Sequence, residues 1–510
     1  MIIIVDFGSQ LAHLIAKKVR MLGEYTEIVP PDQVMNLISE SRPKGIIFSG
    51  GPESVYNPTA PSVPQTLFDQ NIPILGICYG YQLLAHLTGG KVEKGEKSEY
   101  GVTTMTKLTD HPLLEGLEDQ EKVLMSHRDR VITPPPNSQF VATTEKATAA
   151  YADDARAIYG IQFHPEVTHT PKGMQLLVNF LKLCKCERSW SSHVFLESKM
   201  AELRSLEQPI LMAVSGGVDS TVAATMLAKA VPDLLHCVFV DNGLLRLGEA
   251  DRVRKIYEEL FTHFHFVDAS QEFFACLEGL IDPEEKRKAI GHKFIEVFER
   301  TAKELEERFG KFAYLGQGTI YPDRVESAVT STNSAVIKSH HNVGGLPEKM
   351  NLRLVEPLTD LYKYEVREVG EELELPPSLI RRHPFPGPGL AVRCLGEVTP
   401  FHIQQIQKAD AILQENLRMD ERVDYDALWQ SFFVLLPTVR SVGVMGDSRT
   451  YENPGVIRVV ESTDAMTASV ADLPFDLLTK IANEIVNHVP GINRVCLDLT
   501  GKPPGTIEWE

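Results

Sequence analysis

The sequence predicts an α/β protein with two open, mostly parallel-sheet domains followed by a small α+β domain. Apolar runs of strand length alternate with helix-like segments over most of the chain, which is typical of parallel sheets with crossover helices. In two places, after residues 77 and 214, such a run leads into a glycine turn that opens a helix, where open sheets bind ligands. The pattern changes after the proline-rich residues 383–390. We therefore expect domains at residues 1–185, 186–385 and 386–510.

The hydrophobic periodicity predicts the elements of each domain. In the first domain the expected strands are residues 2–5, 45–49, 74–77, 100–107, 140–144 and 157–163, and the expected helices are 10–22 and 174–183. Polar, helix-prone residues 184–208 should join it to the second domain. There we expect strands at 210–214, 236–241, 263–268 and 312–317 and a long helix at 284–310. In the third domain we expect helices at 401–418 and 477–488 and strands at 432–436, 441–445, 456–461 and 492–499.

Composition and charge narrow the functional classes. The 510 residues are 43% hydrophobic and 24% charged, with a formal net charge of −18. Such an acidic surface repels nucleic acid and anionic membranes, and no apolar run approaches the ~20 residues of a membrane helix. The seven cysteines lack the spacing of a disulfide framework, and the close pair Cys184 and Cys186 lacks zinc-ligand partners. The first residues have a strand pattern and not that of a signal peptide, so we expect a cytoplasmic protein without nucleic-acid or membrane partners.

The first glycine turn presents a cysteine. Cys78 follows an apolar strand in the sequence Gly-Ile-Cys-Tyr-Gly, and a helical pattern begins directly after it. This is the arrangement of a nucleophile elbow, and a helix start favours the thiolate. His164 and Glu166 lie two residues apart in an extended segment, so Glu166 can orient the imidazole while His164 accepts the thiol proton. The alternative is a buried cysteine and an unrelated His-Pro-Glu turn.

These residues resemble the class I, or triad, glutamine amidotransferases. The turn Ser-Gly-Gly-Pro-Glu-Ser at residues 49–54 also follows a strand, where that family has its oxyanion-hole loop. The resemblance implies a catalytic triad of Cys78, His164 and Glu166, and oxyanion-binding backbone amides of Gly51 and Tyr79. It also places Gln82 and the segment 126–129 where the family grips glutamine, with Gln82 and Asp129 as the expected contacts.

The second glycine turn is typical of an anion site. An apolar strand leads into Ser-Gly-Gly-Val-Asp-Ser at residues 215–220, and a helix-like run follows. Backbone amides of adjacent glycines at a helix start favour phosphate. The turn lacks the Gly-Lys-Ser/Thr ending of loops that serve γ-phosphate transfer. A tight turn without a ligand is the alternative.

The same turn resembles the PP-loop of N-type ATP pyrophosphatases, which hold pyrophosphate while the α-phosphoryl group activates a carbonyl oxygen. Asp219 would help to hold Mg²⁺ through the pyrophosphate, so Mg²⁺ is the expected cofactor. A glycine turn at residues 315–323 should face the same crevice. Residues 337–347 combine cations with glycines and should form a lid, with a metal site or a plain loop as alternatives. The ATP contacts implied by the resemblance are Ser215, Gly216, Gly217, Val218, Asp219, Ser220, Thr221 and Val240.

Over nearly its whole length the chain resembles the family of glutamine-hydrolysing GMP synthases. The matching segments are residues 323–328, 338–347, 383–390, 442–447 and the tail 500–510. The resemblance implies a homodimer that aminates XMP to GMP with ATP and glutamine, through adenylyl-XMP, and releases AMP, pyrophosphate and glutamate. It also implies XMP contacts from Arg494 and Lys502 to the phosphate and from Ile507 and Glu508 to the purine.

Three other functions would use only some of these motifs. A ligase with another acceptor, such as deamido-NAD, would use the same PP-loop but leaves the triad and the tail unexplained. A nucleotide sensor without catalysis would need neither a complete triad nor a complete loop. Thiolation of transfer RNA, another use of PP-loops, is disfavoured by the acidic net charge.

Overall fold

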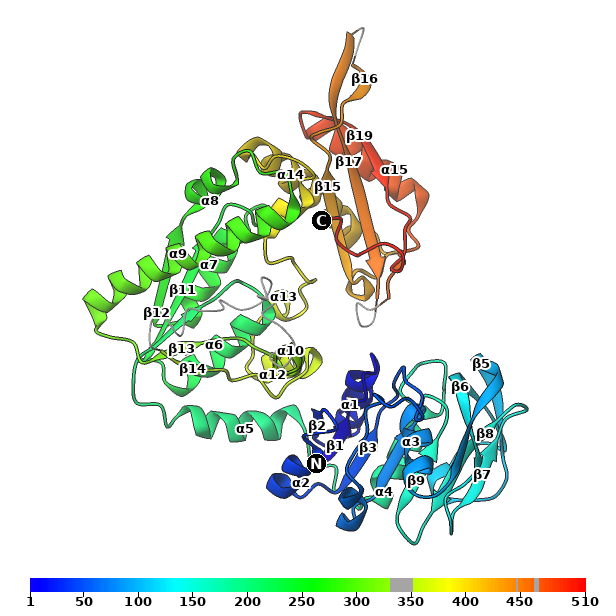
Figure 1. Cartoon of the computed structure of the whole chain (residues 1–510). Helices are drawn as coiled ribbons and strands as arrows, with labels where there is room; N and C mark the ends of the chain where they lie inside the picture. Colours follow the sequence, from blue (N-terminus) through cyan, green and yellow to red (C-terminus); the bar gives the residue numbers. More distant parts are fainter. Residues whose placement is uncertain (331–351, 446–447, 463–466) are drawn as a thin grey trace. The chain divides into compact units, whose positions relative to one another are not determined.

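The computed structural model describes residues 1–330, 352–445, 448–462 and 467–510. The chain divides into two compact units, Met1–Phe195 and Leu196–Glu510, which are described separately (Figure 1). The expected lid at residues 337–347 and the end of the motif at 442–447 lie outside the described residues.

One nine-stranded sheet forms the centre of the first unit. Its order is β2-β1-β3-β4-β9-β8-β7-β5-β6, in which the first five strands are parallel and the other four pair antiparallel. The parallel strands are short and apolar because helices cover them. The turn after β4 lies at the carboxyl edge of the parallel part, between β3 and β9. The strands are β1 (Ile2–Val5), β2 (Thr26–Val29), β3 (Gly45–Phe48), β4 (Ile74–Ile77), β5 (Lys91–Lys107), β6 (Gln120–Thr133), β7 (Gln139–Thr143), β8 (Thr148–Asp153) and β9 (Ile158–Ile161), and the helices are α1 (Ala12–Met21), α2 (Val34–Ser41), α3 (Tyr79–Leu87) and α4 (Gly173–Leu183).

The second unit begins with a five-stranded parallel sheet in the order β12-β11-β10-β13-β14. Its central strand, β10, leads directly into α6, so the second glycine turn also lies at a carboxyl edge. Helix α5 (Ser192–Leu203) crosses from the first unit into the second. The strands are β10 (Ile210–Ala213), β11 (Leu235–Asp241), β12 (His263–Asp268), β13 (Tyr314–Gly316) and β14 (Arg353–Val355), and the helices are α6 (Val218–Ala230), α7 (Glu249–Leu260), α8 (Ser270–Leu277), α9 (Pro283–Phe309), α10 (Tyr321–Thr330), α12 (Lys363–Glu372) and α13 (Pro377–Ile380).

A second sheet of this unit is organised around one long strand, β17 (Ser448–Glu461). It pairs antiparallel with β15 (Gln430–Leu435), β16 (Ser441–Met445) and β18 (Ser469–Val470), and parallel with β19 (Ile492–Leu497). Helices α14 (Pro400–Met419) and α15 (Phe475–His488) pack against it (Figure 1). One hydrophobic core joins both sheets of the unit, because Leu211 and Phe298 belong to the same buried cluster as Phe433 and Ile481.

The predicted fold class is confirmed: two mostly parallel sheets precede a smaller sheet-rich region. The three domain limits stay a prediction. Strands β2, β6, β8, β14 and β18 were not predicted, and β5 and β17 begin earlier than expected. In β6 buried and exposed residues alternate, but the exposed ones are charged or polar, so that the segment lacks an apolar run.

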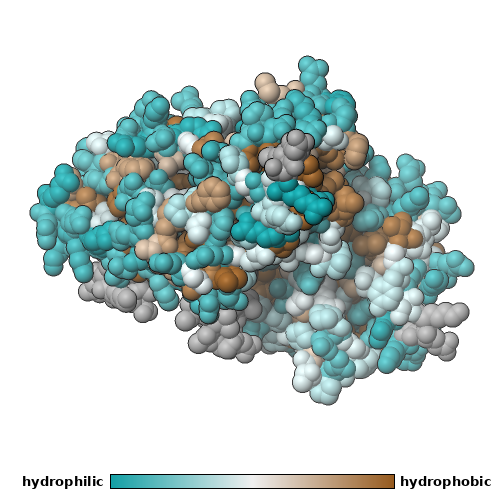
Figure 2. All heavy atoms as spheres, turned by 90° about the horizontal axis from the view of Figure 1, so that it is seen from above, coloured by the Kyte–Doolittle hydropathy of each residue, from teal (hydrophilic) through white to brown (hydrophobic). Residues whose placement is uncertain are grey.

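Hydrophilic side chains cover much of the face seen in Figure 2, with hydrophobic ones scattered among them. Over the described ranges, none of the helices is both long and apolar enough to cross a membrane.

Candidate active sites

The first glycine turn forms a sharp elbow that holds Cys78 between β4 and α3. The cysteine has φ of 54° and ψ of −105°, a conformation that is rare for a residue with a side chain. Two glycines allow strand and helix to meet so closely. A Cβ at Gly76 would lie 2.5 Å from the carbonyl oxygen of Gly80, and a Cβ at Gly80 would lie 2.6 Å from Cβ of Phe48. The local packing therefore presents the thiol at the start of a helix, where a thiolate is stabilised.

The structure brings the other two predicted triad residues to this thiol. His164 Nδ1–H donates to Glu166 Oε1 at 2.7 Å, and the imidazole also shares a hydrogen bond with Cys78. Burial alone lowers the pKa of His164, but the charge of Glu166 and the two hydrogen bonds outweigh it and raise the pKa to about 10. The imidazole thus holds a proton beside the sulfur, which is the pairing that activates a cysteine nucleophile.

Two backbone amides flank the elbow. A Cβ at Gly51 would lie 3.3 Å from Cδ1 of the Tyr79 ring, so the two residues predicted to supply the oxyanion amides are neighbours. Within the described part of the chain neither amide has an acceptor. Unpaired backbone donors beside a nucleophile can bind the negative oxygen of a tetrahedral intermediate.

The predicted glutamine contacts belong to one hydrogen-bond network. Gln82 on α3 donates from Nε2 to the carbonyl oxygen of Asp129 at 2.8 Å and to Gln162 Oε1 at 3.1 Å. The Asp129 carboxylate on β6 accepts from Ser54 Oγ at 2.5 Å. The Cys78 thiol donates to the carbonyl oxygen of Ser126, in the same strand as Asp129, at 3.5 Å. The nucleophile and both residues thus meet along one short stretch of β6.

In the second unit, hydroxyl groups shape the loop between β10 and α6. Ser215 Oγ lies 3.1 Å from Ser220 Oγ and accepts from the Gly217 amide at 3.3 Å, while Thr221 Oγ1 donates to the Gly217 carbonyl at 2.7 Å. Gly216 has φ of 75°, which favours glycine. The loop thus leads directly into the start of α6, and the backbone amides of a helix start attract an anion. Val218 begins that helix, and Val240 lies on the adjacent strand β11.

The glycine turn at residues 315–323 packs against this helix start. A Cβ at Gly318 would lie 2.9 Å from the Ser220 amide nitrogen. The structure therefore brings together the two turns that were expected to face one crevice.

A lysine that the sequence analysis did not identify holds Asp219. Lys363 Nζ, at the start of α12, donates to both carboxylate oxygens of Asp219, at 2.7 and 2.6 Å. Both side chains are partly exposed, at 43% and 30%, so a ligand can reach the pair. The sequence contained one signal: a lysine in the first turn of a helix opposes the helix dipole and so needs another partner.

Arg382 connects the loop to the proline-rich joint at residues 383–390. Its guanidinium donates to the Gly216 carbonyl at 2.9 Å and forms an ion pair with Glu249. It also lies 5.4 Å from the ring centroid of Phe385, and Arg393 lies 5.2 Å from the same ring. Arg393 in turn binds Glu508 of the tail through two hydrogen bonds, at 2.8 and 3.2 Å. Three side chains therefore link the anion loop to the carboxyl-terminal tail.

The predicted XMP residues do not converge within one chain. Arg494 on β19 donates to Ser441 Oγ at 2.7 Å, and β19 pairs it with Pro454 of β17. Lys502 forms a bridge with Ala468, beside the other end of β17. The backbones of Arg494 and Lys502 are thus separated by roughly 25 Å along β17. Ile507 is buried in a small apolar cluster with Phe432, Val434, Val456, Val460 and Ala468.

Two buried cations besides Arg393 hold the tail. Arg458 Nε donates to the carbonyl oxygen of Ile507 at 3.1 Å. Its two Nη atoms donate to the carbonyl oxygens of Thr500 and Thr506, at 2.5 and 2.9 Å. Lys286, at the start of α9, donates to the carboxylate of Glu510 at 2.8 Å. The sequence held one signal for each: Arg458 is a charged residue within an apolar strand, and Lys286 is a cation near a helix start. Either position indicates that the charge needs a partner.

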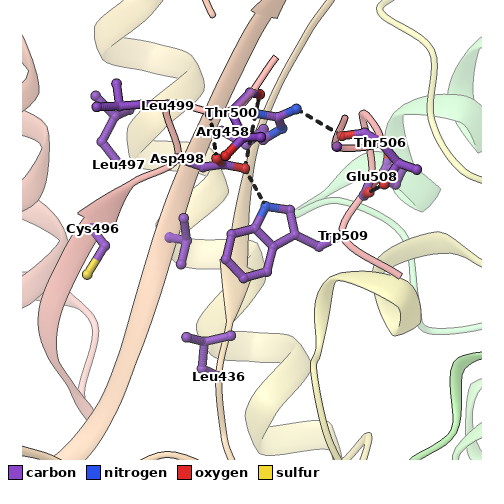
Figure 3. Close-up of a pocket in the computed structure, with 12 residues that line it drawn as sticks. Leu436, Arg458, Cys496, Leu497, Asp498, Leu499, Thr500, Thr506, Glu508 and Trp509 are labelled. Atoms are coloured by element: carbon purple, nitrogen blue, oxygen red, sulfur yellow. Dashed lines mark hydrogen bonds and ion pairs between the residues drawn. The ribbon is translucent and has the colours of Figure 1, made fainter. Parts of the chain in front are cut away.

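A pocket of about 640 Å³ lies between the tail and the sheet. Figure 3 shows Arg458 between Thr500, Thr506 and Asp498, and the Trp509 indole directed toward Asp498, to which it donates at 2.8 Å. Glu508 lines this pocket, whereas Arg494, Lys502 and Ile507 do not.

The residues around the anion loop fit a magnesium ion that arrives with a nucleotide. Mg²⁺ in such sites is held by one or two carboxylates and otherwise by phosphate oxygens and water. Asp219 supplies one carboxylate at the loop, and in the described residues no group of three His, Cys, Asp or Glu side chains could hold a metal. This donor set fits Mg²⁺ that is bound mainly through pyrophosphate.

Comparison with known proteins assigns the chain to a family. The class-I glutamine amidotransferase family model matches residues 3–184, and the GMP synthase C-terminal domain model matches residues 417–509. The chain is 49% identical over 513 residues to the protein named GMP synthase [glutamine-hydrolyzing] of Aquifex aeolicus, covering 100% of this chain and 99% of that one. It is 50% identical over 518 residues to the protein of that name from Symbiobacterium thermophilum, with the same coverage.

The chain belongs to the family of glutamine-hydrolysing GMP synthases. The family resemblance expected from the sequence is thereby confirmed. The roles of individual site residues stay predictions.

Proposed function

We propose that this chain catalyses the ATP-dependent amination of XMP to GMP, using ammonia from glutamine. The observation that carries the proposal is the link from the anion loop through Arg382, Phe385 and Arg393 to the tail residue Glu508. This link supports a loop for ATP and a tail for the acceptor that work together in one unit, while the cysteine–histidine–glutamate site of the other unit would supply ammonia.

The glutaminase half-reaction follows from the geometry of the elbow. Cys78 attacks the carboxamide carbon of glutamine, and the amides of Gly51 and Tyr79 stabilise the oxygen that becomes negative. His164, oriented by Glu166, takes the thiol proton and gives a proton to the departing ammonia. Water then hydrolyses the thioester to glutamate. Gln82 and Asp129 hold the rest of the glutamine molecule.

The synthetase half-reaction uses the loop at residues 215–221. Its helix-start amides and hydroxyls bind the phosphates of ATP, and pyrophosphate stays there as the leaving group. The O2 atom of the xanthine base attacks the α-phosphorus, ammonia adds at C2, and AMP departs with the oxygen. Asp219 would hold Mg²⁺, which neutralises phosphate charge when bound. Lys363 supplies a further positive charge beside that carboxylate.

For the acceptor we propose contacts of Ile507 and Glu508 with the purine and of Arg494 and Lys502 with its phosphate. The backbones of Arg494 and Lys502 lie roughly 25 Å apart along β17, too far for one phosphate to contact both side chains. A homodimer, in which a second copy supplies one of the two, removes this difficulty, and we propose that the protein is a homodimer. We also propose that it works in the cytoplasm.

A substrate screen tests the proposal. The protein is incubated with ATP, Mg²⁺, amide-¹⁵N glutamine and one acceptor at a time, and AMP and pyrophosphate are measured. XMP should give AMP, and the ¹⁵N should appear in the exocyclic amine of GMP. Release of AMP with deamido-NAD and not with XMP would replace XMP with that acceptor. Binding of nucleotides without turnover would point to a sensor.

A further inference from the structure

A second buried histidine–carboxylate pair lies beside the proposed glutamine pocket. Glu99 on β5 and His127 on β6 are direct partners in the pairing of the two strands, at an irregularity between Lys94 and Glu99. Their side chains are only 5% and 4% exposed, and Oε2 of Glu99 lies 3.4 Å from Nε2 of His127. The reaction derived above uses neither of them.

The hydrogen-bond roles around His127 require an additional proton. Nδ1 lies 2.9 Å from the carbonyl oxygen of Asp129, and because a carbonyl only accepts, Nδ1 must carry a hydrogen. In a neutral imidazole Nε2 then carries a lone pair and can only accept a hydrogen bond. An ionised Glu99 can also only accept, so two acceptors would face each other. Among the described residues Nε2 has no hydrogen-bond donor of its own, and Glu99 Oε2 accepts only from Thr144, at 3.2 Å. Two buried acceptors that face each other repel unless a proton lies between them.

The strand segment fixed by this pair contacts the catalytic machinery. The Asp129 carbonyl accepts from both His127 and Gln82, and the Asp129 side chain accepts from Ser54. Ser126, the neighbour of His127, accepts from the Cys78 thiol. A shift of His127 would therefore move the contacts of the nucleophile and of the proposed glutamine ligands together.

We propose that Glu99 and His127 share one buried proton and are positioning residues that preset the glutamine pocket. The inference rests on the proposed glutaminase function of the first unit. Among the described residues, the titratable groups that act on the imidazole are Glu99 from β5 and Asp129 from β6. Gln82 from α3, which shares the Asp129 carbonyl with His127, and its partner Gln162, just after β9, are neutral. Burial lowers the pKa of His127 against the opposing effects of Asp129 and Glu99, which favours a ring whose Nε2 accepts a hydrogen.

Two substitutions of Glu99 separate the shared proton from simple packing. In Glu99→Gln an amide N–H can donate to Nε2, so the KM for glutamine should stay within about twofold of the wild-type value. In Glu99→Leu the volume is similar but no donor remains, so the KM should rise about tenfold while ammonium-driven amination is unchanged. Glu93 on the same strand is exposed and paired with Lys91, and Glu93→Gln and Glu93→Leu are the matched controls.

Nitrogen-15 NMR of the histidine rings tests the proton directly. The His127 signals, assigned by their loss in His127→Gln, should show a hydrogen on Nδ1 and a hydrogen-bonded Nε2 in the wild type and in Glu99→Gln, but a free Nε2 in Glu99→Leu. An unchanged KM in folded Glu99→Leu, or equal impairment of Glu99→Gln and Glu99→Leu, would overturn the proposal. A wild-type protein that hydrolyses no glutamine would instead refute the proposed function, and the NMR result would still decide whether the proton is shared.

Discussion

Replacing Arg458 by lysine should release the carboxyl-terminal tail while leaving the sheet beneath it folded. The Arg458 side chain is 1% exposed and donates to the backbone carbonyls of Ile507, Thr500 and Thr506. It also lies 3.0 Å from the carboxylate of Asp498. A lysine ammonium lacks the planar fork of a guanidinium and cannot reach all of these acceptors at once.

The size of the effect follows from the bonds that are lost. A hydrogen bond from a charged donor contributes ~1.5–3 kcal/mol. A lysine that keeps Asp498 and one carbonyl loses two such bonds, which is roughly 3–6 kcal/mol. Since 1.4 kcal/mol corresponds to a factor of ten, even the lower figure increases opening of the tail by about 100-fold.

Hydrogen exchange and substrate titration measure this change. The amides of Lys502 and Gly505, which donate to Ala468 and Gly501, should exchange about 100-fold faster in Arg458→Lys. The KM for XMP should rise, whereas ATP should bind as before because its loop lies elsewhere in the unit. Arg422→Lys is the matched control, since Arg422 is 52% exposed and pairs with the carboxylates of Asp420 and Asp476, away from the tail. Wild-type tail exchange in folded Arg458→Lys would refute the reasoning.

Four further predictions test the two sites. Cys78→Ala should abolish glutamine-driven amination, and ammonium-driven amination should stay within a few-fold of wild type; loss of both in a folded variant would show that the thiol site is not separable. Asp219→Ala should abolish amination from either nitrogen donor, because loss of this contact raises the activation free energy by ~3 kcal/mol or more. Normal ammonium-driven turnover in this variant would exclude the pyrophosphatase assignment. Lys502→Ala should raise the KM for XMP, because it removes a charge-assisted contact that contributes ~1.5–3 kcal/mol to binding. The affinity for ATP should stay unchanged, as isothermal calorimetry can measure. The pKa of His164 is about 10 in the folded protein, above roughly 6.5 in the unfolded chain. Its pair with Glu166 therefore stabilises the first unit fully below about pH 6.5, and this stabilisation is lost as the pH rises toward about 10. Calorimetric unfolding should show this alkaline loss of stability in the wild type and a smaller loss in His164→Gln.

The features that sequence could predict are those whose signal is local. Both glycine turns combine an apolar strand, small residues and a helix start within about fifteen residues, so their geometry follows from neighbouring residues. Strand β12 has the predicted bounds because its sequence, His-Phe-His-Phe-Val-Asp, shows the alternation of polar and apolar residues that is typical of a strand. By contrast, β6 contains the charged stretch around Asp129, and its alternation becomes meaningful only when β5 pairs with it.

The pairings that hold the second site together have no such local signal. Lys363 meets Asp219 across 144 positions, Arg393 meets Glu508 across 115, and Lys286 meets Glu510 across 224. Each cation stands where its charge is costly on its own, at a helix start or in an apolar setting, so the sequence indicates that a partner exists but not which one. The separation of Arg494 from Lys502 was likewise invisible, because β17 and its neighbours determine it.

Transfer of the xanthine oxygen tests the central claim most directly. XMP that carries ¹⁸O at position 2 is incubated with the protein, ATP, Mg²⁺ and glutamine, and the AMP is analysed by mass spectrometry. If XMP is adenylylated at O2 and then aminated, each GMP formed should be matched by one AMP that carries the ¹⁸O in its phosphate. Formation of GMP with unlabelled AMP, or with ADP and phosphate in place of AMP and pyrophosphate, would contradict the account.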